Sequence, residues 1–192
     1  ALALFLMLAA FSPVQAAAAP ERTAHVVVAL CDNENQCIVP VPPKLGNGSD
    51  PAGNLYWGAA FGVKTFMRKQ GDWKLVKTEP HPRQHILERA YLRNEKLALT
   101  LVADAYDGAA IKEATLAFLV YAAGKWAQDL TLNGKTVGAG GRAGLVVYVG
   151  HNGLMDFSLS ELPIIESSQK RFGRNAAIFA CQSKAYFSDI LD

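Results

Sequence analysis

The chain has 192 residues, of which 51% are apolar, and its formal net charge at pH 7 is +2. That is enough chain for one domain with a sizeable core. Because the net charge is close to zero and the basic residues are scattered, the sequence gives no electrostatic case for a nucleic-acid partner.

Residues 1–18 are predicted to be a secretory signal peptide that is truncated at its start. Residues 1–11 are apolar and uncharged, and a tract of small residues follows them. This pattern is typical of the apolar and cleavage regions of a signal, and the run is short for a membrane span. We therefore expect a secreted or periplasmic protein that has no membrane partner after signal removal. An uncleaved N-terminal anchor is the alternative.

The first half of the remaining chain begins with a predicted strand. The β-branched run HVVVAL predicts a buried strand over residues 25–30. Prolines and glycines then exclude regular structure from residues 31–54. Apolar residues at helical spacing predict a helix over 55–69, which ends at a glycine. Alternation predicts a strand over 73–78.

The middle of the chain is less regular. Residues 86–92 fit either a strand or a short helix, and the apolar pattern of residues 96–106 predicts a strand. A helix is expected over 109–123. The glycine-rich residues 133–144 are interpreted as a linker.

The last elements complete an alternation of strands and helices. Strands are predicted over 145–149 and 176–180, with a short helix between them within residues 158–171. The alternation predicts a mainly parallel sheet that is covered on both faces, within a single α/β domain over residues 19–192. Because the helical pattern at the end stops without a cap, we expect this domain to continue beyond Asp192.

A histidine and a cysteine follow the last two predicted strands. The carboxyl ends of parallel strands meet at one edge of a sheet, where ligands bind, and adjacent strands lie about 5 Å apart. We therefore expect His151 and Cys181 to lie together. A thiolate is a nucleophile, an imidazole can take its proton, and a helix after Cys181 would favour the thiolate. The backbone N–H groups of Gly153 and Cys181 would then bind the developing oxyanion.

At these residues the chain resembles the caspase-like cysteine peptidases, a group that includes caspases, gingipains, clostripain, legumain and separase. Their signature is an apolar block ending in His-Gly and a second one ending in Ala-Cys, which correspond here to LVVYVG before His151 and to AAIFA before Cys181. The resemblance implies a caspase-like three-layer α/β/α sandwich and a peptidase that needs no cofactor. Peptide or protein substrates would be cleaved through a thioester acyl-enzyme. His151 corresponds to the general base, Cys181 to the nucleophile and Gly153 to the oxyanion-hole glycine.

The residues expected to contact substrate are Asp104 and Asn152. The sequence departs from the family at Asn152, which stands where the family has glycine directly after the histidine. Together with Asp32 and Asp107, Asp104 is expected to place negative charge at the same edge of the sheet, which would favour a basic substrate side chain. For Asp32 and Asp107 the alternative role is turn capping.

Two other classes of function stay open. An inactive binding or structural module would keep the sheet and bury Cys181. A metal site formed by His151, Cys181 and an aspartate is disfavoured, because the sequence offers no credible close-spaced pair of ligands. Cys31 and Cys37 are six residues apart, and an oxidising compartment would permit a disulfide between them if the backbone brings them close.

Overall fold

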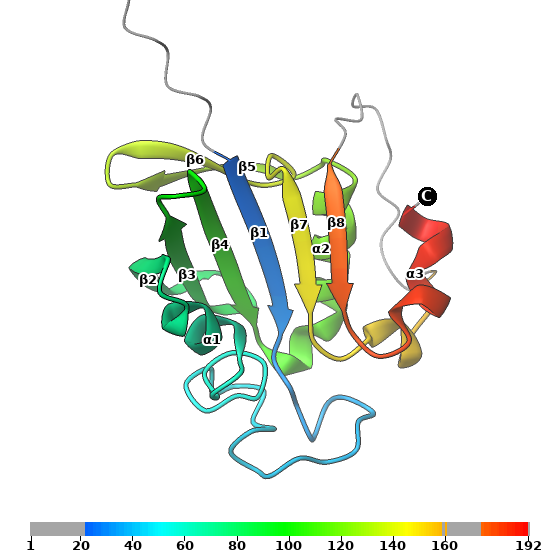
Figure 1. The fold of residues 1–192 in the computed structure, drawn as a ribbon. Coiled ribbons are helices and arrows are strands. Elements are labelled where there is room, and N and C mark those ends of the chain that lie inside the picture. Colours follow the sequence, from blue (N-terminus) through cyan, green and yellow to red (C-terminus); the bar gives the residue numbers. More distant parts are fainter. Residues whose placement is uncertain (1–21, 159, 161–173, 192) are drawn as a thin grey trace, which may run out of the picture.

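The computed structural model, which describes residues 22–158, 160 and 174–191, has an α/β fold built on a six-stranded sheet (Figure 1). The predicted signal peptide lies outside the described residues, as does most of the helix predicted within 158–171. No helix in the described ranges is long and apolar enough to cross a membrane.

The sheet is mixed, with the strand order β2-β3-β4-β1-β7-β8. Four neighbouring strands run parallel, namely β4 (Leu99–Tyr106), β1 (Arg22–Ala29), β7 (Leu145–Val149) and β8 (Asn175–Phe179). The antiparallel hairpin of β2 (Trp73–Arg83) and β3 (Ile86–Asn94) extends the sheet beyond β4. The expectation of a mainly parallel sheet therefore holds for this four-stranded part.

The chain order reverses beside β1. After β1 the chain forms β2, β3 and β4 on one side of it and later β7 and β8 on the other. In open α/β sheets, ligands bind at the carboxyl ends of the strands beside such a reversal. In this chain, the segments that follow β1 and β7 begin at that edge, because Val28 of β1 pairs with Val149 of β7.

Each face of the sheet carries its own core. Val27 and Ala29 of β1 pack in a cluster with α2 (Ile111–Ala122), whereas Val26 and Val28 pack in a second cluster with Trp57. Because successive strand residues point to opposite faces, α2 covers one face, and α1 (Val63–Lys69) lies on the other (Figure 1).

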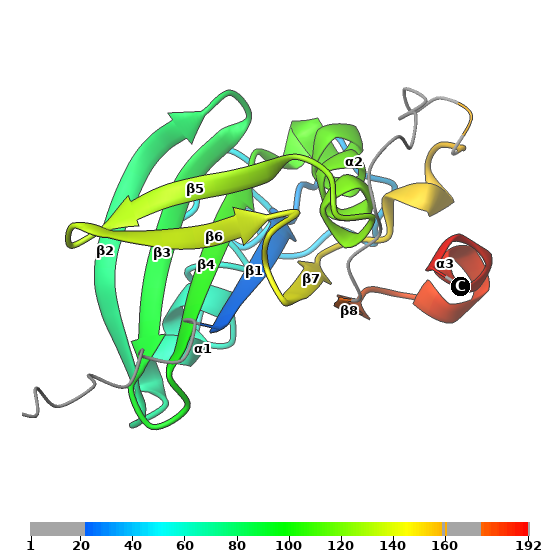
Figure 2. The same ribbon diagram turned by 90° about the horizontal axis from the view of Figure 1, so that it is seen from above.

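A second, two-stranded sheet includes part of the segment 133–144 that we predicted to be a linker. The strands β5 (Ala127–Leu132) and β6 (Lys135–Gly140) make a hairpin across the face that α2 also covers (Figure 2). Its turn consists of Asn133 and Gly134, which have φ angles of 50° and 75°. Asn-Gly with two positive φ angles is the preferred sequence of a tight hairpin turn. The Asn-Gly pair was therefore a hairpin signal that we overlooked within the glycine-rich segment.

The predicted helix over 55–69 is also corrected, since only its last part is helical. The carbonyl of Asn54 accepts from the N–H groups of Trp57, Gly58 and Ala59, which holds the residues before α1 in turns. The ambiguous segment 86–92 is a strand, β3. Residues 95–98 form the turn before β4, which starts three residues later than we predicted.

Candidate active site

His151 and Cys181 occupy equivalent positions after adjacent parallel strands. Val149 of β7 pairs with Phe179 of β8, and each of the two candidate residues follows its strand by two positions. Gly150 turns the chain between β7 and His151 with a φ of 151°, and a Cβ there would meet the carbonyl oxygen of Ala29 at 2.8 Å. Only glycine fits that close approach. The two residues therefore share one edge of the sheet, as we expected.

Asn152 ties these two strand ends together. Its side-chain Nδ2 donates to the carbonyl oxygen of Cys181 at 3.0 Å, and its Oδ1 accepts from the N–H of Leu154 at 3.1 Å. The residue is fully buried. Our expectation that Asn152 contacts substrate is therefore not supported, because both ends of its amide are used inside the protein. It acts as a cross-link between the loops after β7 and β8.

The His151 ring is held by Asp156, a residue that the sequence analysis did not single out. The distance from His151 Nε2 to Asp156 Oδ2 is 3.0 Å, and the two side chains are 6% and 13% exposed. The same oxygen accepts from the N–H of Cys37 at 3.3 Å. Among the described residues, no hydrogen bond joins the His151 ring to the exposed Cys181. The only sequence signal for Asp156 was a carboxylate five residues after the histidine.

Gly153 begins a short 3₁₀ helix, Gly153–Met155, beside His151. A Cβ at Gly153 would meet the Phe157 ring at 2.7 Å and Thr115 Oγ1 at 2.9 Å, so the position accepts glycine alone. Within the described ranges, neither the Gly153 N–H nor the Cys181 N–H has an acceptor. Two backbone donors thus remain near the histidine and the thiol.

The turn after Cys181 leads into the predicted helix. Gln182 has a φ of 50°, in the left-handed region, and α3 (Ser183–Leu191) follows directly. Cys181 therefore lies two residues before a helix N-terminus, where the helix dipole favours negative charge. This agrees with the placement expected from the sequence.

Tyr56 is a second residue of this edge that the sequence analysis missed. The buried Asn54 side chain accepts from the N–H groups of Cys31 and Tyr56, which fixes Tyr56 at the carboxyl end of β1. Burial raises the pKa of Tyr56 to about 12, and the thiols of Cys31 and Cys181 add to the effect. The Tyr56 phenol is therefore neutral and lies within electrostatic range of Cys181. The apolar periodicity had placed Tyr56 in the helix predicted over residues 55–69.

Cys31 and Cys37 are not joined by a disulfide. Cys31 is buried at the end of β1, and Cys37 is exposed. Burial raises the pKa of the Cys31 thiol, and the neighbouring Asp32 raises it further. The possible bridge is therefore absent from the structure, and Cys31 has the environment of an inert core thiol.

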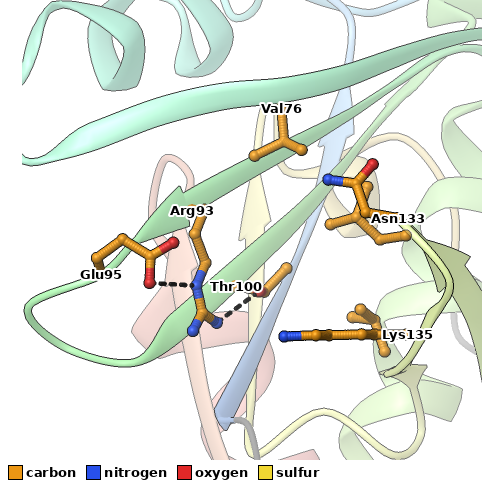
Figure 3. A pocket seen from close by; sticks show the side chains of 8 residues that line it. Val76, Arg93, Glu95, Thr100, Asn133 and Lys135 are labelled. Atoms are coloured by element: carbon orange, nitrogen blue, oxygen red, sulfur yellow. Dashed lines mark hydrogen bonds and ion pairs between the residues drawn. The ribbon is translucent and has the colours of Figure 1, made fainter.

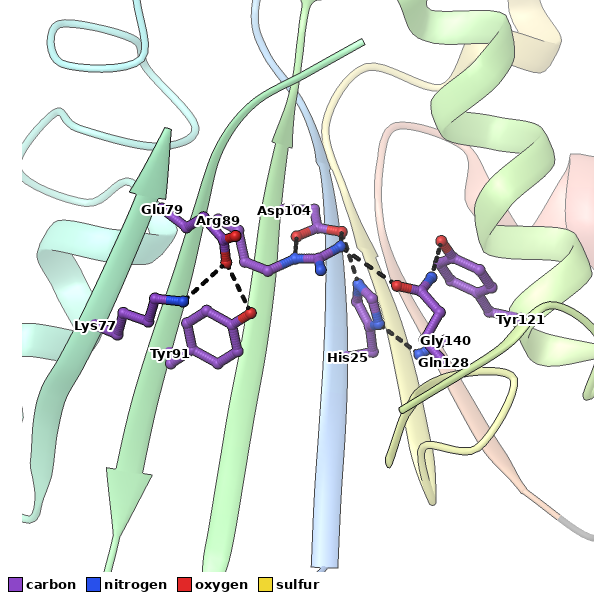
Figure 4. A network of polar contacts seen from close by, with 9 residues as sticks. All are labelled: His25, Lys77, Glu79, Arg89, Tyr91, Asp104, Tyr121, Gln128 and Gly140. Carbon is purple, nitrogen blue, oxygen red and sulfur yellow. Dashed lines mark hydrogen bonds and ion pairs between the residues drawn. The ribbon is translucent and has the colours of Figure 1, made fainter. Parts of the chain in front are cut away.

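Asp104 does not lie at the edge of the sheet, which corrects its predicted role. It lies within β4, is fully buried, and receives hydrogen bonds from Arg89 at 2.5 and 2.7 Å (Figure 4). Nε2 of His25 lies 3.1 Å from Asp104 Oδ2, the oxygen that also accepts from Arg89 Nη2. Burial alone would raise the pKa of Asp104, but the contacts with Arg89 and His25 lower it to about 2. Asp104 is thus part of the core.

The other two predicted acidic residues act as turn caps. Asp32 Oδ1 accepts from the N–H groups of Glu34 and Asn35, and Asp107 Oδ1 accepts from the N–H of Ala109. Both line a polar cavity of about 570 Å³ at the carboxyl edge of the sheet. The capping alternative is confirmed for both residues.

Two further findings bear on other kinds of site. In the part of the chain that the structure describes, no group of three or more His, Cys, Asp or Glu side chains is placed to hold a metal ion. A smaller hollow of about 180 Å³ lies near the start of β4, where Arg93 contacts Glu95 and Thr100 (Figure 3). No cysteine or histidine lines it, and it lies at the opposite edge from Cys181.

Comparisons with protein-family models, curated proteins and solved structures found no match to this chain.

Proposed function

We propose that the protein is an exported, caspase-like cysteine peptidase in which Cys181 is the nucleophile and His151 the general base. The observation that carries the proposal is the placement of both residues two positions beyond the paired strands β7 and β8. The parallel order β4-β1-β7-β8, with helices on both faces, supports a three-layer α/β/α sandwich of the caspase-like type. Export is proposed from the signal-like residues 1–18.

In the proposed reaction, the Cys181 sulfur attacks the carbonyl carbon of a peptide bond while His151 takes the thiol proton. The negative charge that develops on the carbonyl oxygen is bound by the N–H groups of Gly153 and Cys181. His151 then gives its proton to the departing amine, which leaves a thioester on Cys181. Water activated by His151 hydrolyses the thioester and releases the acid. Peptides or proteins outside the cytoplasm are the proposed substrates.

The test is hydrolysis of a fluorogenic peptide library by the purified protein. Cys181→Ala and His151→Ala should each lower kcat/KM by about 10³-fold or more, since nucleophile and base act as one unit. Cys37→Ala is the matched control, because it removes an exposed thiol at the same edge. Activity that survives both changes would show that the assignment is wrong.

A catalytically inactive binding module is the second candidate. It is favoured by the existing contact of His151 with Asp156 and by the absence of a Cys181–His151 hydrogen bond among the described residues. Apo active sites often have such loose geometry, so this observation alone does not decide. Iodoacetamide labelling of Cys181 separates the two: a peptidase thiol should react at pH 6, whereas an inert thiol should react only above about pH 7.

A further inference from the structure

We propose that Asp156 is a positioning residue that holds the His151 ring in the tautomer needed by a base. The inference rests on the proposed function, since it concerns how His151 would take the proton of Cys181. A carboxylate can only accept hydrogen bonds, so the ring nitrogen that contacts it carries the hydrogen. At the 3.0 Å contact with Asp156, this nitrogen is Nε2. The neutral ring then has an unprotonated Nδ1, which is the basic atom.

The backbone between the two residues is built for this contact. The 3₁₀ helix Gly153–Met155 reverses the chain, and the Asp156 N–H donates to the carbonyl oxygen of Gly153 at 2.9 Å. The carbonyl oxygen of His151 in turn accepts from the Tyr148 hydroxyl at 2.8 Å. Backbone contacts thus fix the histidine and the aspartate separately, so their side-chain hydrogen bond needs little further ordering.

A second donor also contacts the carboxylate of Asp156. The N–H of Cys37, in the long loop after β1, donates to the same Oδ2 atom at 3.3 Å. An amide N–H can only donate, so the oxygen that it contacts must accept. The loops after β1 and β7 therefore meet at one carboxylate oxygen, at the edge where the chain order reverses.

The contact with Cys37 also suggests a structural role, so the test must separate positioning from simple loop attachment. Both contacts of the carboxylate are made with Oδ2, so whatever replaces this atom faces the Cys37 N–H and the ring together. In Asp156→Asn, the amide oxygen can take that place and accept from both, because a carbonyl oxygen has two lone pairs. Asp156→Ala removes the acceptor, so the hydrogen of the neutral ring is no longer held on Nε2. The tautomer of the ring is therefore the readout that a loop attachment alone would not change.

The experiment uses the full chain labelled with ¹⁵N-histidine and records the long-range ¹H–¹⁵N spectrum of each ring. Wild-type His151 and His151 in Asp156→Asn should show the Nε2–H tautomer, and Asp156→Ala should show the Nδ1–H tautomer in a substantial fraction of the rings. His25, whose Nδ1 accepts from the Gly140 N–H, is the internal control and should keep the Nε2–H form in all three proteins. An Nδ1–H tautomer of His151 in the wild type would overturn the proposal.

The kinetic readout is the rate at which iodoacetamide alkylates Cys181 at pH 7. Asp156→Ala should lower this rate at least tenfold, and Asp156→Asn, which keeps the acceptor, should retain more of it. An unchanged tautomer and rate in a folded Asp156→Ala protein would also overturn the proposal. A tautomer change in a protein that hydrolyses no peptide would retain the positioning role and reject the proposed function. The two failures are therefore distinguishable.

Discussion

The described part of the chain contains two histidine–aspartate pairs with nearly equal geometry and opposite surroundings. His25 Nε2 lies 3.1 Å from Asp104, and His151 Nε2 lies 3.0 Å from Asp156. The first pair is inside the sheet, with both side chains at 0% exposure, whereas the second lies at the edge. The same chemical contact therefore occurs in two different environments.

The other ring nitrogen distinguishes the two pairs. Nδ1 of His25 accepts from the N–H of Gly140 at 2.7 Å, so both of its nitrogens are used (Figure 4). For His151, no partner for Nδ1 occurs within the described residues. A histidine with two internal partners holds elements together, while one with a single partner retains a nitrogen for proton transfer. The surroundings of the two pairs therefore favour a structural role for the first and are compatible with the chemistry proposed for the second.

The largest expected effect is on the buried pair. Asp104→Ala should lower the free energy of unfolding by about 3–5 kcal/mol, because it leaves the Arg89 guanidinium as an unpaired charge in the core. Urea denaturation measures the change. Asp156→Ala is the matched variant and should lose less than about 1 kcal/mol. Equal losses in the two variants would remove the distinction between the pairs.

Acid should weaken the buried pair in a defined pH range. The pKa of Asp104 is lowered from 3.8 to about 2 in the folded protein, so the unfolded chain binds the proton more readily. The resulting stabilisation is present above about pH 4 and is lost as the pH falls toward 2, by about 2 kcal/mol. Urea midpoints at pH 5 and pH 2.5 measure the loss.

Asp104→Asn provides the control for this pH effect, because it removes the titrating carboxyl group while keeping its shape. If the wild type and Asp104→Asn lose the same stability between pH 5 and pH 2.5, the effect comes from other carboxyl groups.

Removal of the His25 ring nitrogens should destabilise the β5–β6 hairpin. His25→Phe keeps a ring beside Tyr121, whose centroid is 4.9 Å away, but leaves the Gly140 N–H without its acceptor. An unsatisfied buried donor costs about 1–2 kcal/mol. The Gly140 amide should therefore exchange its hydrogen about tenfold faster. In His151→Phe the exchange of Gly140 should be unchanged, and acceleration in both variants would contradict the comparison.

The edge pair was partly predictable from sequence because its signals are local. An apolar strand followed by glycine and histidine, and a second one followed by cysteine, place His151 and Cys181 at strand ends without knowledge of the fold. Asp156 was missed because its contact depends on a 3₁₀ turn, which local sequence patterns indicate only weakly. Tyr56 was missed because a helical pattern was extended over a segment that Asn54 holds in turns.

The buried pair was not predictable because its partners are distant in sequence. His25 and Asp104 are 79 residues apart, and only the parallel register of β1 and β4 brings them together. Arg89 reaches Asp104 through β3, a segment that fitted strand or helix equally well. Without these strand pairings, Asp104 appeared to be an acidic residue at a strand end, and we assigned it to substrate. Sheet register is a non-local property, and one chain's pattern does not determine it.

The smallest effect is expected for an aspartate–arginine ion pair that is exposed to solvent. Arg142 Nη1 contacts both oxygens of Asp129 at 2.7 Å on the hairpin, but the two side chains are 55% and 53% exposed. Solvent screens such pairs, so Asp129→Asn should change the free energy of unfolding by less than about 0.5 kcal/mol. The same urea titration that detects Asp104→Ala measures this change. A loss comparable with that of Asp104→Ala would mean that contact geometry, rather than burial, determines how much each aspartate contributes. In that case, the structural role assigned to the His25 pair could not be inferred from its surroundings.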